Sequence, residues 1–245
     1  MKQTVFKLGE LFCGPGGMAL GAKLALSQTS KDGEVFSISH LWGVDRDRNA
    51  IATYNANELG EGVCCDATAF VASNKGCAHK TIADFDSITA LAFGFPCNDF
   101  STVGERRGTG GVFGQLYKAG VAALNIENPM WFVAENVSGI HSANSGEAFK
   151  QIQKELSSAG KHGYDLTVNL YKFEDYGIPQ YRHRYIIVGI RKDLKTPQGK
   201  KVVFKIPAPT HLGNHTSARE ALSRHCAQGV ANCEFTEQQD RKSVV

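Results

Sequence analysis

The sequence predicts an α/β protein whose mostly parallel sheet carries helices on both faces. Two observations support this prediction. Apolar strand-like runs alternate with amphipathic stretches along most of the chain, and glycines, acids and a cysteine stand where several of these runs end. Such alternation is typical of βαβ units. The 245 residues, of which 42% are hydrophobic, are enough for one large domain of this class.

The predicted strands are short apolar runs rich in β-branched or aromatic residues. They cover residues 6–12, 36–44, 88–95, 132–134, 166–173 and 185–190. The predicted helices repeat apolar residues at a helical period and cover residues 18–27, 48–59, 116–126, 146–159 and 217–227. No helix separates the last two strands, so we expect them to form an antiparallel pair. The glycine-rich, basic residues 106–111 are predicted to form a mobile loop.

Composition limits the class of protein. The net charge of +3 is too small to argue by itself for nucleic-acid binding, and no apolar run approaches the roughly 20 residues of a membrane span. The first residues lack a signal-peptide pattern. The seven cysteines lack the paired spacing of a disulfide framework or a zinc site, so we expect reduced thiols, a cytoplasmic protein and no metal.

A glycine-rich turn follows the first predicted strand and opens the first helix. Gly14, Gly16 and Gly17 let backbone amides approach a ligand closely, and the helix start offers N–H donors. Asp45 ends the next strand, and Asp66 is a further strand-end acid; such carboxylates can meet the ribose or the base of a nucleoside. The glycine spacing also fits the dinucleotide fingerprint, so a nicotinamide or flavin site stays open at this point.

Two further strand ends carry groups suited to catalysis. Cys97 follows Pro96 and precedes the polar Asn98, an arrangement that exposes a thiol. The alternative is that Cys97 is a small buried hydrophobe, as cysteines at strand ends often are. Glu135 ends another apolar run, and by itself it fits a solvated acid or a helix cap equally well.

Arginines gather before the last predicted strand. Gln180, Arg182 and Arg184 alternate along its entry, so we expect their side chains on one face. Two arginines on one face suit an anionic or carbonyl-rich ligand, while the alternative is an exposed face of an edge strand.

In their order and spacing, four motifs resemble those of the cytosine-C5 DNA methyltransferases. They are Phe12-Cys-Gly14-Pro-Gly16-Gly17, Gly94-Phe-Pro96-Cys97, Glu135-Asn136-Val137 and Gln180 through Arg184. Asn98 departs from the family, which usually carries glutamine after the nucleophile. The resemblance implies a Rossmann-like methyltransferase fold that uses S-adenosylmethionine (SAM). A nicotinamide-dependent oxidoreductase remains the alternative, although it would give Cys97 and Glu135 no task.

The resemblance also implies a role for each candidate residue. Cys97 would add to C6 of cytosine, Glu135 would stabilise the charge that develops on the base, and the two arginines, Arg182 and Arg184, would hold its carbonyl edge. The base would have to be flipped out of double-stranded DNA to reach these groups. The cofactor SAM would lie against Phe12, Gly14, Gly16, Asp45, Arg46, Asp66 and Leu116.

The family continues with a target-recognition region and further motifs that this sequence does not contain. We therefore expect a catalytic SAM-binding domain at residues 1–209, and a lead-in helix and tail at residues 210–245, with a sheet that is incomplete at its C-terminal end. The chain resembles the alpha subunit of a two-subunit modification methylase of a restriction system, so a second subunit is expected to supply target recognition. A tRNA cytosine methyltransferase shares the same motifs, so RNA stays open as an alternative substrate.

Overall fold

A computed structural model describes residues 3–25, 28–29, 33–73, 80–95, 116–141 and 146–226 of the protein. The chain divides into two compact units. Unit 1 consists of Met1–Thr167 and Ile187–Phe204, and unit 2 consists of Val168–Ile186 and Lys205–Val245. The expected nucleophile Cys97 and the expected loop at residues 106–111 lie outside the described residues.

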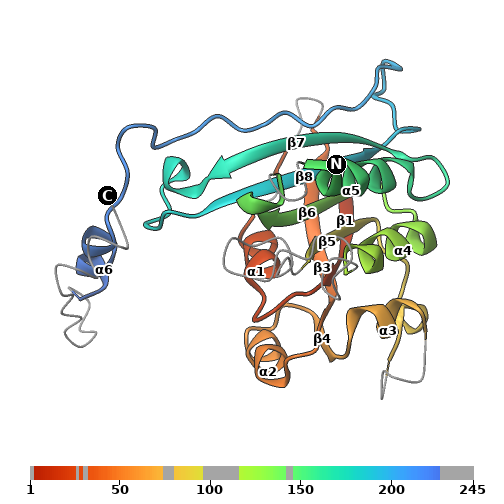
Figure 1. Cartoon of the computed structure of the whole chain (residues 1–245), viewed down its shortest axis with the longest axis horizontal. Coiled ribbons are helices and arrows are strands. Elements are labelled where there is room, and N and C mark those ends of the chain that lie inside the picture. The colour runs from red at the N-terminus through yellow and green to blue at the C-terminus, as the bar shows by residue number, and fades with distance from the viewer. Residues whose placement is uncertain are drawn as a thin grey trace. The chain divides into compact units, whose positions relative to one another are not determined.

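The strands of the described part form one eight-stranded, mostly parallel sheet (Figure 1). They are β1 (Gln3–Leu11), β2 (Gln28–Thr29), β3 (Val35–Asp45), β4 (Glu61–Cys64), β5 (Ala90–Gly94), β6 (Trp131–Val137), β7 (Tyr164–Lys172) and β8 (His183–Arg191). Their order in the sheet is β2-β3-β1-β5-β6-β8-β7, and β4 pairs with β3. Because β1, β3, β4, β5 and β6 run parallel to their neighbours in this group, their carboxyl ends meet at one edge.

Helices cover both faces of the sheet in unit 1. The α-helices are α1 (Gly17–Leu24), α2 (Arg48–Ala56), α3 (Ala67–Val71), α4 (Tyr117–Glu127), α5 (Glu147–Ser158) and α6 (Ala218–Cys226). The 3-10 turns are η1 (Ile82–Asp84), η5 (Ser138–His141) and η7 (Phe173–Tyr176). Helices α1 and α2 lie on one face, and α3, α4 and α5 lie on the other (Figure 1). This arrangement confirms the predicted fold class.

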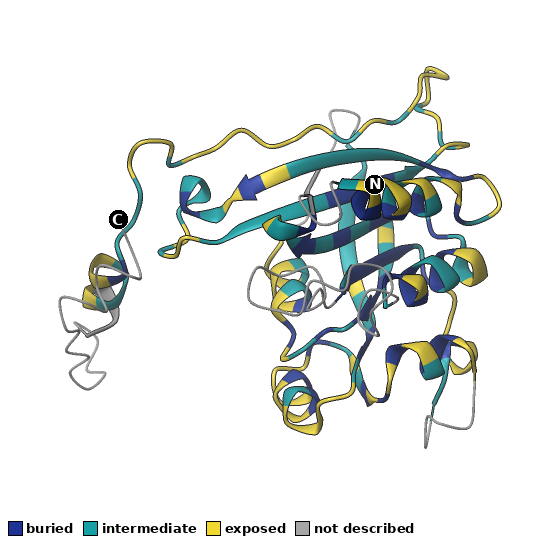
Figure 2. Ribbon diagram, viewed as in Figure 1, coloured by how far each residue is buried: buried dark blue, intermediate teal, exposed yellow. Residues whose placement is uncertain are grey.

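The core of unit 1 lies around the central strands, as the dark ribbon segments of Figure 2 show. Every residue of β5 except Gly94 is buried. Aromatic rings occupy the space that glycines leave open on these strands and helices. A Cβ at Gly43 would lie 2.6 Å from the ring of Tyr54, and a Cβ at Gly120 would lie 2.5 Å from the ring of Phe93. These glycines let α2 and α4 pack closely against the sheet.

Each predicted strand and helix overlaps an observed one. The list of predicted elements did not include β2 or α3, which are only two and five residues long, and the four-residue β4 was implied only by the expected strand-end position of Asp66. Segments this short contain too few residues to show a helical or strand period. The adjacent positions of β7 and β8 agree with the expected pairing of the last two strands.

Two expectations about composition can be compared with the described residues. Among the helices of this part of the chain, none is long and apolar enough to cross a membrane. Cys13 and Cys64 are free thiols. Cys65 is in a disulfide, so the expectation that every cysteine is reduced is wrong at that position.

Candidate active site

The candidate site lies at the edge of the sheet where the parallel strands end. The glycine turn follows β1, Asp45 is the last residue of β3, and Asp66 comes two residues after β4. Glu135 lies near the end of β6, on the other side of β1 and β5 in the strand order. Strand ends at such an edge are the usual location of ligand sites in parallel sheets.

The turn after β1 has an unusual backbone. Phe12, Gly14 and Gly16 all have positive φ angles, of 57°, 53° and 98°. Gly16 is buried, and a Cβ at this position would lie 2.3 Å from a side-chain carbon of Leu59. In contrast, a Cβ at Gly14 or Gly17 would meet no atom within 4 Å. The turn therefore packs against Leu59 and against Tyr54 of α2, and it leaves the backbone at Gly14 and Gly17 accessible to a ligand.

Asp45 ties the end of β3 to this turn. The Gly14 N–H donates to Oδ2 of Asp45 at 2.9 Å, and the Asp47 N–H donates to Oδ1 at 2.9 Å. A carboxylate oxygen can accept a second hydrogen bond, so Asp45 can hold the turn and still accept from a ribose hydroxyl. The exposed Arg46 follows directly, where its guanidinium can reach a ligand at the same edge.

Asp66 is the N-cap of α3. Its Oδ1 accepts from the N–H groups of Thr68 and Ala69, at 2.9 and 3.2 Å, and from the Thr68 hydroxyl. Partial burial acts to raise the pKa of Asp66, but these hydrogen bonds outweigh it and hold the pKa below its usual value. Asp66 thus has a structural role as a helix cap, in addition to the contact with a nucleoside that the sequence analysis expects. Leu116 precedes α4 as its N-cap residue and is partly buried.

Glu135 lies beside the end of β5. It is paired in register with Gly94, and a Cβ at Gly94 would lie 3.5 Å from Oε2 of Glu135 and 3.6 Å from Cε of Met18. The absence of a side chain at Gly94 thus leaves room for the Glu135 carboxyl group. Cys97 is three residues after Gly94 in the sequence and lies outside the described residues.

Asn136 is a site residue whose role the sequence analysis missed. It is buried, at 2% exposure, and its side-chain amide donates to the carbonyl of Phe95 at 3.2 Å. Its side-chain oxygen accepts from the Val137 N–H at 2.7 Å. Asn136 therefore fixes the end of β5 just before Pro96 and Cys97. Its position directly after an acidic residue in a buried strand was the signal that could have indicated this role.

The arginine motif belongs to unit 2, with Arg182 and Arg184 both partly buried. Strand β8 begins at His183, so Arg182 precedes the strand and the predicted alternation does not extend across the whole motif. Nε2 of His183 lies 2.6 Å from Oε1 of the buried Glu174, and the Arg182 N–H donates to the same carboxylate at 3.4 Å. Glu174 thus holds the segment that carries both arginines.

The structure brings one group of predicted residues together and leaves others apart. Phe12, Gly14, Gly16 and Asp45 lie in one continuous turn and strand end. Asp66, Leu116 and Glu135 begin or end neighbouring elements of unit 1. In the described part of the chain, no group of histidine, cysteine and acidic residues could hold a metal ion.

Comparison with known proteins identifies the family. The model of the C-5 cytosine-specific DNA methylase family matches residues 6–242. The chain is 47% identical to the type II methyltransferase M.BbvI of Brevibacillus brevis, over 98% of the chain and 61% of that protein. It is 31% identical to the type II methyltransferase M.NgoFVII of Neisseria gonorrhoeae, over 96% of the chain and 57% of that protein. The chain thus spans less than two thirds of these relatives.

A solved structure shares the fold. A prophage-encoded E. coli protein described as a DNA modification methyltransferase superposes with a TM-score of 0.61 at 23% identity. The match covers 89% of this chain and 54% of that one. At this identity the likeness concerns the fold, whereas the family model covers nearly the whole sequence. The chain belongs to the C-5 cytosine-specific DNA methylase family.

Proposed function

We propose that the chain is the catalytic part of a type II modification methyltransferase of a restriction system. It would transfer a methyl group from SAM to C5 of cytosine in a specific sequence of double-stranded DNA. The observation that carries the proposal is the shared sheet edge, where the glycine turn, Asp45 and Glu135 stand at the ends of parallel strands. Family membership favours methyl transfer over the oxidoreductase alternative.

The residues of the glycine turn suit the methyl donor. Gly14 and Gly17 face open space, so a ligand can approach their backbone, and the start of α1 offers amide donors to its carboxylate. Asp45 is assigned to the ribose, and Phe12, Gly16, Arg46, Asp66 and Leu116 are assigned to the rest of the donor. When bound, SAM supplies an electrophilic methyl group.

The catalytic residues are assigned to the flipped cytosine. The Cys97 thiolate adds to C6, and the electron pair moves to C5, which then takes the methyl group. Loss of the C5 proton and expulsion of the thiolate restore the aromatic base. Glu135 stabilises the charge on the ring during the attack. Arg182 and Arg184 hold the carbonyl edge, and the Glu174–His183 pair keeps their segment in place.

We further propose that a second subunit supplies target recognition. In the described sheet, β7 has a strand neighbour on one side only. Unit 2 also has large exposed hydrophobic side chains, namely Leu170, Ile178, Tyr181, Ile206 and Leu212. An open strand edge and exposed apolar side chains are both features that a second chain can cover. In this proposal residues 1–209 carry catalysis and residues 210–245 lead toward the recognition region.

Two measurements test the proposed function. Equilibrium dialysis with labelled SAM and labelled NAD should show binding of SAM alone. The chain, expressed together with its recognition subunit, should transfer a labelled methyl group to DNA, and nucleoside analysis should find 5-methylcytosine. Preferential binding of NAD would reject the proposal. Labelling of tRNA in place of DNA would reject the DNA substrate and support the alternative.

A further inference from the structure

A buried polar chain lies directly behind the glycine turn. Glu10 of β1 is 1% exposed, and among the described residues only Asn136 and Glu174 are other buried polar or charged residues. Oε2 of Glu10 lies 3.2 Å from Nε2 of His40, whose side chain is 6% exposed. A carboxyl group so deep in the core needs a partner, because an unpaired charge there is costly.

The chain of contacts continues from His40 to α2. Nδ1 of His40 lies 2.8 Å from the Tyr54 hydroxyl, which donates to the carbonyl of Leu59 at 3.0 Å. The tyrosine has one proton, so His40 must donate from Nδ1 if all contacts are made. The contact with Glu10 then needs one more proton, either on Nε2 of His40 or on Glu10. The complete chain therefore keeps one proton that the Glu10–His40 pair shares.

The same carboxyl group holds the first turn of α1. The Ala19 N–H, in that turn, donates to Glu10. The glycine turn starts two residues after Glu10, where the Gly16 N–H donates to the carbonyl of Cys13 at 3.0 Å. Glu10 thereby connects β1 and β3 with the start of α1.

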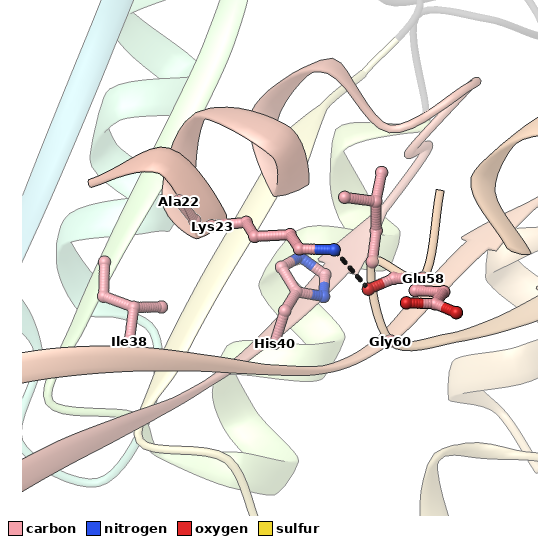
Figure 3. Close-up of a pocket in the computed structure, with 7 residues that line it drawn as sticks. Ala22, Lys23, Ile38, His40, Glu58 and Gly60 are labelled. Carbon is pink, nitrogen blue, oxygen red and sulfur yellow. Dashed lines mark hydrogen bonds between the residues drawn. The ribbon is translucent and has the colours of Figure 1, made fainter. Parts of the chain in front are cut away.

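A pocket gives solvent a route to the pair. It has a volume of about 200 Å³ and is lined by Ala22, Lys23, Ile38, His40, Glu58, Leu59 and Gly60 (Figure 3). Lys23 donates to the carbonyls of Asn57 and Glu58 at 3.1 and 3.2 Å, so its ammonium group is held at the pocket wall. His40 is part of this wall, so a proton can pass between the imidazole and water.

The other titratable groups around Glu10 are few. Asp45 and the Cys13 thiol interact with it electrostatically from the strand ends, and Tyr54 faces the pair from α2. Lys23 and Glu58 face His40 across the pocket. Burial raises the pKa values of Cys13 and Tyr54, so both stay neutral near pH 7. Cys13 and Tyr54 therefore add no charge beside the pair, and the proton that the pair shares sets the charge behind the turn.

We propose that Glu10 is a positioning residue for the donor-binding turn, and that it holds the start of α1 in place for SAM only while the Glu10–His40 pair keeps its proton. The proposal rests on the proposed function, because it concerns the turn assigned to SAM. Loss of the proton leaves an uncompensated carboxylate behind the first turn of α1 and removes one link of the polar chain. A negative charge there repels the carboxylate of the donor from the amides of that turn.

The direction of the pH dependence follows from this arrangement. Burial raises the pKa of Glu10, although His40 acts against it. The pair loses its proton as one unit, with an apparent pKa that belongs to both residues. The donor binds the proton-holding form more tightly, so its affinity falls as the pH rises. By linkage, bound donor must raise the apparent pKa of the pair by the same factor.

Calorimetric titration with SAM tests the proposal in the preparation that binds the labelled donor. From about pH 5.5 to about pH 8.5, the Kd of the wild type should rise by roughly fivefold or more. Glu10→Gln should bind SAM with a Kd that stays flat, because its amide can donate to His40 and accept from Ala19 without a titrating proton. Glu10→Ala should lose roughly tenfold or more in affinity at every pH, since it makes neither contact.

The control is Asp86→Asn, which removes an exposed carboxylate paired with Lys7 at 3.1 Å and should keep the slope of the wild type. NMR titration of the His40 imidazole in the wild type, with and without SAM, tests whether bound donor raises the apparent pKa of the pair. This measurement does not depend on whether a variant folds. An unchanged pKa on donor binding, a flat wild-type Kd or a wild-type slope in Glu10→Gln would each overturn the inference. Failure of the wild type to bind SAM at any pH would overturn the proposed function and the inference with it.

Discussion

At the sheet edge, individual side chains with structural contacts are also assigned to the proposed chemistry. Asp45 accepts from two backbone amides and is also assigned to the ribose. Asn136 holds the Phe95 carbonyl, two residues before Cys97. These contacts fix the backbone from which the reactive groups extend. A substitution therefore tests the chemical role of a residue alone only where its side chain makes no hydrogen bond to the backbone.

Cys97→Ser should abolish methyl transfer, because a serine hydroxyl is a far weaker nucleophile than a thiolate. The variant should still fold and bind SAM. DNA that contains 5-fluorocytosine should trap the wild type as a covalent adduct, with mass spectrometry locating the bond at Cys97. The exposed free thiol Cys64 offers the matched control, Cys64→Ser, which should keep full activity. An adduct at another residue would show that the nucleophile is assigned wrongly.

Glu135→Gln keeps the shape of the side chain but removes its charge and its transferable proton. Turnover should fall by roughly 10²–10⁴-fold, the range of a positioned acid, while SAM affinity changes little. Single-turnover kinetics and calorimetry measure the two quantities separately. Unchanged turnover with a large loss of SAM affinity would place Glu135 in the donor site instead.

At the scale of elements, the starts of α1 and α3 are assigned to the donor site. The buried Gly16 begins α1 with a φ of 98°, and Asp66 caps α3 with its carboxylate. Both residues therefore determine where a helix begins and also line the edge to which SAM is assigned. Substitutions of Gly16 or Asp66 should change both the stability of the protein and its affinity for SAM, and the two changes can be measured separately.

Gly16→Ala should destabilise the protein by at least about 1–2 kcal/mol, because a Cβ would be strained at positive φ and would clash with Leu59. The displaced turn should also weaken SAM binding. Gly21→Ala is the matched control in the same helix, where a Cβ meets open space and should stabilise by about 0.5–1 kcal/mol. Urea denaturation and calorimetry give the two quantities. Equal stability of both variants would contradict the packing described for Gly16.

Asp66→Asn should keep the cap of α3 but lose the charge offered to the donor, whereas Asp66→Ala should lose both. The alanine variant should be less stable by about 1 kcal/mol, and the asparagine variant close to the wild type. Since the pKa of Asp66 is lowered in the folded protein, its stabilising contribution is present above its ordinary pKa and disappears as the pH falls through the folded value. Denaturation of the three proteins at neutral and acidic pH checks this order. Asp66→Asn that binds SAM like the wild type would limit Asp66 to its capping role.

At the scale of the whole molecule, the chain contains the catalytic motifs of its family but spans only 61% of M.BbvI. Exposed hydrophobic residues of unit 2 and the open side of β7 are the features that a second subunit would cover. Both features lie in the part of the sequence that follows β6.

The chain alone should show negligible sequence-specific methylation of DNA. Addition of a polypeptide with the recognition region should restore activity, and the two should copurify through an interface of about 1,600 Å² or more. Labelled-donor assays on mixed-sequence DNA, with purity checked by mass spectrometry, measure both states. Leu212→Lys, at a residue that is 73% exposed, should weaken copurification, whereas Lys205→Glu serves as the control for a charge change in the same unit. Robust methylation of one fixed sequence by the pure chain would refute the need for a partner.

The sequence predicted the helices and strands better than the contacts between side chains of the candidate site. Long periodic segments such as β1 and α5 were recognisable because many residues repeat the same pattern. The short β2 and α3 gave no such signal. The link from Glu10 to His40 joins two strands 30 positions apart, and no local pattern shows which residues will meet over that separation. The role of Asn136 depends in the same way on the neighbouring strand.

The pairing of glycines with aromatic rings has a consequence for how the family can diverge. Tyr54 and Phe93 occupy the space that Gly43 and Gly120 leave open, so neither member of a pair can change in size alone. A methyl group added at Gly43 needs a smaller side chain at position 54. A smaller side chain at position 54 beside an unchanged Gly43 leaves a cavity. Evolution should therefore exchange these residues in pairs. Homologues with alanine at the position of Gly43 should carry a residue smaller than tyrosine where this chain has Tyr54.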